Sequence, residues 1–137
     1  MDNVHIKNTG IVYSEDVPAE YYIGLPWDYC YRIMYNHTPV GKVFLVEGED
    51  GSDYGDSDCI YIQWIELDED CQGKGYIRGA IEALEKAFCN NKRFITAECN
   101  DELLPMYEHL GFRFVEKNPY TFDDMNRIRK EIRKENV

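Results

Sequence analysis

The sequence predicts an α/β (α+β) fold, in which a mixed sheet is flanked by helices, and two observations carry this prediction. Hydrophobic residues make up 44% of the 137 residues, and 11 Tyr, 6 Phe and 2 Trp supply the material of a buried core. In the second half, runs with strand periodicity alternate with runs of helical periodicity in the order β-α-β-α-β. This length is typical of one domain, so we expect a single domain over residues 1–137.

The first predicted elements are strands. Residues 30–36 and 42–47 are rich in β-forming residues, and the segment between them contains the turn-formers Pro39 and Gly41, which predicts a hairpin. Residues 1–29 show no long helix but contain two more candidate strands. These candidates are residues 4–8 and 10–14.

The strongest strand prediction covers residues 59–67, a nearly continuous apolar run that is typical of a central strand covered on both faces. A charged, glycine-containing turn follows, and residues 76–88 then carry apolar side chains at helical spacing. These apolar positions are Ile77, Ala80, Ile81, Leu84 and Phe88. The expected elements after this helix are a strand over 94–99, a short helix over 101–110 that ends at Gly111, and a strand over 112–117.

Beyond Pro119 the sequence predicts a terminal helix. Thr121, followed three residues later by Asp124, has the spacing of a capping box. Apolar side chains then recur at helical spacing and would form one buried face. They are Phe122, Met125, Ile128 and Ile132.

The charge is strongly negative and uneven. The formal charge of −11 disfavours a nucleic-acid surface, because phosphate contacts need clustered Lys and Arg. Residues 1–70 hold 15 acidic against 3 basic side chains, a net of −12, whereas residues 71–137 hold 11 against 12, a net of +1. An anionic ligand therefore fits the second half better. No run approaches the ~20 apolar residues of a membrane span, and the N-terminus lacks a secretion signal, so we expect a cytoplasmic protein without a membrane partner.

The potential metal ligands do not form a recognisable site. The five cysteines include no C-x-x-C pair and have no His at ligand spacing, so we expect reduced thiols and no bound metal. Residues 47–58 contain six carboxylates but lack the calcium-loop pattern, which leaves a solvated loop. A catalytic Cys would need an adjacent base, and the three His have no readable relation to any thiol.

The segment with the clearest chemistry is the turn of residues 72–78, between the strand over 59–67 and the helix over 76–88. Backbone N–H groups at a helix start have no intrahelical partner, so this turn is a candidate site for a phosphate. Neither the Walker A pattern nor the dinucleotide fingerprint is present. The alternative is a plain tight turn that uses Gly73 and Gly75 only for their backbone freedom.

A second group of residues follows the strand over 94–99. Asn100 ends that strand, Tyr107 lies on the next helix, and Gly111 and Phe112 begin the next strand. Together with the turn, this pattern resembles motifs A and B of the GNAT superfamily of acyl-CoA-dependent N-acetyltransferases. The resemblance spans residues 59–116, and the hairpin before it is similar to the second and third strands of the family. It implies a mostly antiparallel, twisted sheet with a splayed central strand pair.

The resemblance also implies roles for individual residues. The family pattern [Q/R]-x-x-G-x-[G/A] matches at Gln72 and Gly75 but not at Ile77, where the family has Gly or Ala. In similar proteins the backbone amides of this turn hold the coenzyme A pyrophosphate. The corresponding residues here are Gln72, Gly73, Lys74, Gly75, Tyr76, Ile77 and Arg78. The pantetheine arm would pair with the strand end from Ile65 to Leu67 and pass near Asn100.

The resemblance assigns the acid of the reaction to Tyr107, which would protonate the departing thiolate. A base for the amine is expected on the strands that flank the splay, where the carboxylates are Glu66, our first choice, and Glu98. Tyr61 and Gln63 are candidates to hold a relay water. Each motif residue also has a structural alternative: Asn100 as a helix cap and Tyr107 as a packing residue.

The leading hypothesis is therefore an N-acetyltransferase that moves an acetyl group from acetyl-CoA, its co-substrate, to a primary amine by direct attack. The acceptor amine is expected to be cationic, because of the negative charge of residues 1–70. Two alternatives remain: a GNAT-like module that binds an acyl-CoA without turnover, and a structural domain with an accidental glycine turn. The terminal helix would replace the last hairpin strand of the family, leaving either an open acceptor cleft or a cleft completed by a second subunit, a possible homodimer.

Overall fold

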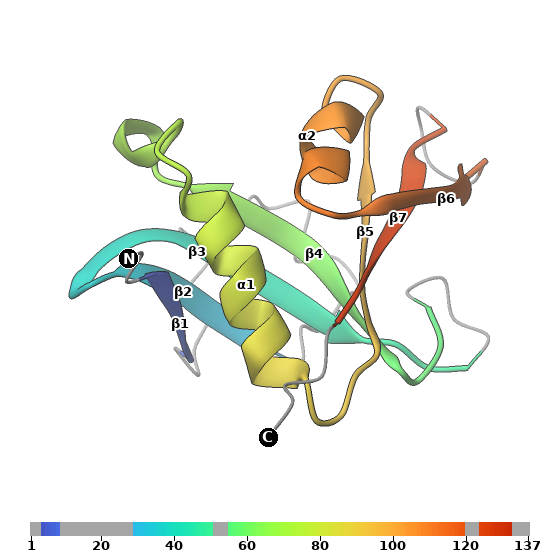
Figure 1. Cartoon of the computed structure of the whole chain (residues 1–137), viewed down its shortest axis with the longest axis horizontal. Helices are drawn as coiled ribbons and strands as arrows, with labels where there is room; N and C mark the ends of the chain where they lie inside the picture. Colours follow the sequence, from blue (N-terminus) through green and yellow to red (C-terminus); the bar gives the residue numbers. More distant parts are fainter. Residues whose placement is uncertain (1–3, 9–28, 51–54, 120–123, 133–137) are drawn as a thin grey trace. The chain divides into compact units, whose positions relative to one another are not determined.

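A computed structural model describes residues 4–8, 29–50, 55–119 and 124–132. Within them the strands form a seven-stranded sheet in the order β1-β2-β3-β4-β5-β7-β6, and two α-helices accompany it (Figure 1). The expected fold class, a mixed and mostly antiparallel sheet with helices, is confirmed. The elements are β1 Val4–Asn8, β2 Tyr29–Tyr35, β3 Thr38–Glu47, β4 Cys59–Leu67, the 3-10 helix η3 Glu69–Cys71, α1 Tyr76–Phe88, β5 Phe94–Cys99, α2 Leu104–His109, β6 Arg113–Lys117 and β7 Asn126–Glu131.

The chain divides into two compact units, which are described separately below. The first unit comprises residues 1–46 and 63–84, and the second comprises residues 47–62 and 85–137. The single domain predicted over the whole chain stays a prediction. None of the helices in the described residues is long and apolar enough to cross a membrane.

In the first unit, β1, β2 and β3 pair as successive antiparallel strands. The predicted hairpin is present, but its turn lies elsewhere than expected. Asn36 adopts φ 55°, a left-handed conformation that Asn tolerates, so the chain reverses between β2 and β3 at this residue. Pro39 and Gly41 therefore lie inside β3, beside a bulge in the register. A Cβ at Gly41 would collide with the carbonyl oxygen of Glu66, so this glycine permits close approach of two backbones.

The same unit contains most of α1. The helix buries one apolar face, as its 3.6-residue periodicity predicts, and in this unit the buried members of that face are Ala80, Ile81 and Leu84. Gly79 lies against Val4 of β1: a Cβ on Gly79 would lie 2.7 Å from the Cβ of Val4. Residues 4–8, one of the two candidate N-terminal strands, thus form a real strand, whereas residues 10–14 lie outside the described part of the chain.

In the second unit, β4 and β5 are parallel, and the ladder joins Cys59–Tyr61 to Phe94–Thr96. A parallel ladder confined to the first three residues of each strand is what a splayed strand pair requires. The strand β7 pairs antiparallel with β5 on one side and with β6 on the other. Large apolar side chains from the three central strands are fully buried, among them Ile60, Ile95 and Ile128.

The predicted terminal helix is wrong, because this segment forms the strand β7. Asp124 adopts φ 47°, which is incompatible with a helical start there. From Asn126 onward the buried positions alternate, with Asn126, Ile128 and Ile132 inside and Arg129 exposed. A spacing of four residues between Ile128 and Ile132 suits both a helix and a strand, so the sequence pattern was ambiguous. The final hairpin β6–β7 is thus present, which removes the observation that suggested an open cleft or a second subunit.

The helix predicted over 101–110 is shorter in the structure, where residues 101–103 form a turn before α2. Gly111 ends it as expected, with φ 100°.

Replacing Ile128 by Ala tests the position of β7. Because Ile128 is 1% exposed and lies between β5 and β6, we expect the free energy of unfolding to fall by about 2–5 kcal/mol. Glu131→Ala, on an exposed residue of the same strand, serves as the control and should cost under about 1 kcal/mol. Denaturant unfolding of both variants provides the comparison, and equal losses in the two would contradict the burial of β7.

Candidate active site

The turn after β4 has the geometry of an anion site. Gly73 and Gly75 adopt φ 78° and 81°, conformations that strongly favour glycine, so both residues are needed to shape the turn. A Cβ built on either would meet no other atom within 4 Å, so the backbone here is open to an incoming group. The amide of the Gln72 side chain donates a hydrogen bond to the Leu67 carbonyl oxygen at 3.4 Å, which ties the turn back to the end of β4.

The first residues of α1 supply the donors. The N–H of Gly79 bonds to the carbonyl oxygen of Gly75 at 3.4 Å, so the amides of Tyr76, Ile77 and Arg78 precede the intrahelical ladder. Their N–H groups lie at the positive end of the helix dipole. The predicted residues 72–78 thus form the turn and the first residues of α1, and all of them except the half-buried Tyr76 and Ile77 are exposed.

Charge and side-chain volume around the turn also suit an anion. Lys74 and Arg78 are both exposed and add positive charge beside the free amides. Ile77, which departs from the family pattern, is half-buried with the apolar face of α1 and therefore does not close the turn.

The end of β4 belongs to the first unit and carries the first-choice base. Glu66 is exposed, and its Oε2 accepts a hydrogen bond from the indole Nε1 of Trp64 at 3.1 Å. Ile65 is half-buried and Leu67 is buried. Gln63, expected to hold a relay water, has a buried Oε1 without a hydrogen bond among the described residues.

In the second unit, Glu98 lies in a hydrogen-bonded group that the sequence predicted only in part. Its Oε1 accepts a hydrogen bond from the Tyr61 hydroxyl at 3.2 Å, and its Oε2 accepts one from the Asn118 side-chain amide at 2.9 Å. Tyr61 was a candidate to hold a relay water and Glu98 was a candidate base, and the structure shows a hydrogen bond between them. Asn118 was missed: it is 4% exposed, and no local pattern distinguishes a buried Asn before a proline from a turn residue.

Asn100 performs the capping role that was its structural alternative. Its Oδ1 accepts a hydrogen bond from the backbone N–H of Leu103 at 2.8 Å and so stabilises the turn that leads into α2. Asn100 itself is exposed.

Tyr107 packs as a core residue and keeps a protonated hydroxyl. It is 8% exposed, and its ring meets Phe112 edge-on with centroids 5.4 Å apart. Burial, with a smaller contribution from Cys99, raises the pKa of Tyr107 above its usual value of 10.0. The phenol therefore stays protonated throughout the neutral range, as a proton donor must.

Glu98 lines a cavity of about 290 Å³ in the second unit. Its walls come from residues 55–61, from β5, and from the hairpin β6–β7, and they include Tyr61, Thr96, Arg127 and Arg129. Glu66 does not line it, so the two candidate bases belong to different groups of residues.

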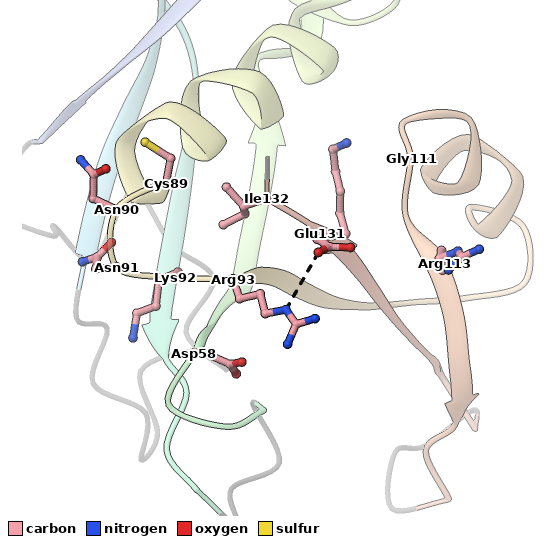
Figure 2. A pocket seen from close by; sticks show the side chains of 11 residues that line it. Asp58, Cys89, Asn90, Asn91, Lys92, Arg93, Gly111, Arg113, Glu131 and Ile132 are labelled. Carbon is pink, nitrogen blue, oxygen red and sulfur yellow. Dashed lines mark ion pairs between the residues drawn. The ribbon is translucent and has the colours of Figure 1, made fainter. Parts of the chain in front are cut away.

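A larger pocket of about 1060 Å³ lies in the same unit, beyond the C-terminal end of α1 (Figure 2). Three of its four cationic side chains form ion pairs with acidic residues: Arg93 with Glu131 at 3.9 Å, Lys92 with Glu47 at 3.5 Å and Lys130 with Glu85 at 3.5 Å. None of the predicted site residues lines this pocket.

The cysteines do not form a nucleophile or a metal site in the described part of the chain. All five are free, and the described residues contain no cluster of three or more His, Cys, Asp or Glu that could hold a metal. Burial, together with the hydrogen bond to Asp58, raises the pKa of Cys59 to about 11. Burial also raises the pKa of Cys99. Both thiols thus stay protonated at neutral pH, which disfavours covalent catalysis.

Comparison with known proteins defines the family. Residues 6–112 match the model of the acetyltransferase (GNAT) family, so the chain belongs to this family of acetyltransferase enzymes. No curated protein sequence shows a significant match to the chain.

Solved structures share the fold at low sequence identity. A GNAT family acetyltransferase from Elizabethkingia anophelis with acetyl-CoA bound is 18% identical, with a TM-score of 0.73 over 96% of this chain and 99% of its own. A Bacillus subtilis acetyltransferase in complex with CoA is also 18% identical, with a TM-score of 0.68 over 93% and 98%. The ribosomal-protein-S18-alanine N-acetyltransferase from Escherichia coli is 19% identical, with a TM-score of 0.58 over 94% of each chain.

Proposed function

We propose that this enzyme transfers the acetyl group of acetyl-CoA to a primary amine by direct attack on the thioester. The observation that carries the proposal is the open turn of Gly73 and Gly75 at the free N-terminus of α1, in a chain of the GNAT family. The coenzyme-bound structures with this fold support acetyl-CoA as the co-substrate. In this proposal residues 72–78 hold the pyrophosphate, and Ile65, Leu67 and Asn100 contact the pantetheine arm.

In the proposed reaction, the acceptor ammonium first loses a proton, and the amine nitrogen then attacks the thioester carbonyl carbon. The base takes the first proton and passes it to solvent. The new C–N bond forms as the C–S bond breaks, and the second proton of the nitrogen passes through solvent to restore the Tyr107 phenol after it has protonated the thiolate. The thiolate takes a proton from Tyr107. The products are an N-acetylated amine and coenzyme A, and no covalent enzyme intermediate is needed.

We assign the base to Glu98 instead of Glu66. Both oxygens of Glu98 are held by neutral donors, which orients the carboxylate while leaving each oxygen with a further lone pair. Glu66 is exposed, and among the described residues the Trp64 indole is the one hydrogen-bond donor to its carboxylate. General-base catalysis depends first on position, and Glu98 is the candidate that is held in place and lines a cavity.

The alternative, an acyl-CoA-binding module without turnover, is separated from the enzyme by incubation with acetyl-CoA and a panel of amines. Mass spectrometry of the products is the readout. An N-acetylated product that increases with enzyme concentration supports the proposal. Coenzyme binding without any product would instead favour the module.

Gly75→Asp and Gly75→Asn form a matched pair that tests the coenzyme site. Both side chains have nearly the same size and tolerate a positive φ, but only Asp adds a negative charge where the pyrophosphate is expected. Calorimetric affinity for coenzyme A should fall at least ~10-fold further in the Asp variant than in the Asn variant. Thermal melts control for folding, and equal affinities in two folded variants would remove the pyrophosphate from this turn.

Tyr107→Phe tests the proton donor. Because a thiolate is a fair leaving group, kcat should fall by about 10²-fold, toward the lower end of the range for general acids, while coenzyme affinity stays unchanged. The hydroxyl makes no hydrogen bond among the described residues, so the melting temperature should hardly change. A variant with the wild-type kcat would leave Tyr107 as a packing partner of Phe112 and make water the acid.

We further propose a cationic acceptor, because residues 1–70 carry a net charge of −12 that concentrates cations. The kcat/KM for such an acceptor should then decline several-fold as NaCl rises from about 20 mM to about 300 mM, since salt screens the attraction. Sucrose at matched osmolarity is the control and should have little effect. A net anionic preferred acceptor, or a kcat/KM that is insensitive to salt, would exclude this attraction.

A further inference from the structure

The cavity that contains Glu98 carries charges of both signs. Its volume of about 290 Å³ suits a small molecule, and its floor is formed by β5 and β7. Three acidic and two basic side chains line it, which gives the lining a formal charge of −3 + 2 = −1. These side chains are Asp56, Glu98, Glu116, Arg127 and Arg129.

The negative charge of Glu98 has no cationic partner bonded to it in the described residues. Its two hydrogen bonds come from a phenol and an amide, which are neutral donors. Arg127 lies directly opposite Glu98 in the β5–β7 ladder, but its guanidinium forms an ion pair with Glu116, with 3.0 Å between Nη1 and Oε1. A half-buried carboxylate with only neutral donors favours a cation from outside the protein.

Arg129 is a cationic side chain that lines the same cavity as Glu98. Its guanidinium carbon lies 4.6 Å from the centroid of the Phe94 ring, a cation–π contact that does not neutralise its charge, and the side chain is exposed. Arg129 makes no ion pair with any acidic residue that the structure describes. A planar fork of donors of this kind suits a carboxylate.

We propose that this cavity is the acceptor site and that it takes a small amine of net charge +1 that also carries a carboxylate, as basic amino acids do. The amine to be acetylated lies against Glu98, and the carboxylate of the acceptor bonds to Arg129. The net charge of −1 on the lining matches a ligand with two ammonium groups and one carboxylate. This inference rests on the proposed acetyl transfer and specifies its acceptor.

Pairs of amines that differ only in the carboxylate provide the test: lysine and 1,5-diaminopentane, ornithine and 1,4-diaminobutane, arginine and agmatine. The wild-type enzyme should favour the carboxylated member of at least one pair by ~10-fold or more in kcat/KM. In Arg129→Gln this preference should fall to near unity, mainly because the carboxylated member is used less well.

Arg93→Gln is the matched control. Arg93 also lies over the Phe94 ring, at 5.0 Å, but it does not line this cavity. Removal of one guanidinium from the ring is therefore common to both variants, and only the Arg129 variant removes a charge from the cavity. The Arg93 variant should keep the wild-type preference, and a loss as large as that of Arg129→Gln would overturn the assignment.

The other outcomes separate this inference from the proposed function. Turnover of amines with no preference for the carboxylated member of any pair overturns the inference and leaves acetyl transfer intact. If no amine is turned over, binding is measured instead, by calorimetric titration of the same amines into the enzyme saturated with coenzyme A. Binding that favours the carboxylated amine and depends on Arg129 would then support the site, while acetyl transfer would fail. Absence of both turnover and binding for every amine overturns the inference.

Discussion

The parallel pairing of β4 with β5 is the constraint on which the arrangement of the site depends. Two adjacent parallel strands cannot be joined by a hairpin, so the chain must leave the sheet and return through a crossover. That crossover is the glycine turn followed by α1, which begins at Tyr76 and ends at Phe88. The ladder covers only Cys59–Tyr61 and Phe94–Thr96. A short parallel ladder thus requires a helix after β4, and it leaves the later residues of β4 and β5 unpaired with each other.

The candidate residues of the two units differ in their electrostatics. The turn of Gly73 and Gly75 offers backbone N–H groups, which attract an anion without depending on any titratable side chain. At Glu98, by contrast, the protein supplies a negative charge. The Tyr61 hydroxyl and the Asn118 amide, both neutral donors, orient this carboxylate without neutralising it. Tyr107 is neutral because burial disfavours the phenolate. An acyl transfer to an amine needs all three conditions: a bound anionic coenzyme, an oriented base and a protonated acid.

The correspondence between sequence and structure was closest where one periodicity dominated. The continuous apolar run of residues 59–67 and the 3.6-residue pattern of residues 76–88 became β4 and α1 with the predicted bounds. The helix predicted after Pro119 was wrong because the four-residue spacing of Ile128 and Ile132 occurs in both helices and strands. Its strand state is imposed by β5 and β6, whose backbone groups need partners. In the hairpin, Pro39 and Gly41 looked like turn residues, but Asn36 takes the left-handed conformation instead.

The sequence by itself determined the fold class, the order of the central elements and the place of the glycine turn, because these depend on local periodicity and on glycine's backbone freedom. It also supplied Tyr61, Glu98, Asn100 and Tyr107 as candidates. Only the tertiary structure decided which of them are in contact: it paired Glu98 with Tyr61 and with the unsuspected Asn118, and it buried Tyr107 against Phe112. Hydrogen bonds between residues 20 and 37 positions apart depend on strand register and burial. The alternation of apolar residues restricts the register of each strand, but the partner strand that lies beside it is decided by the tertiary fold.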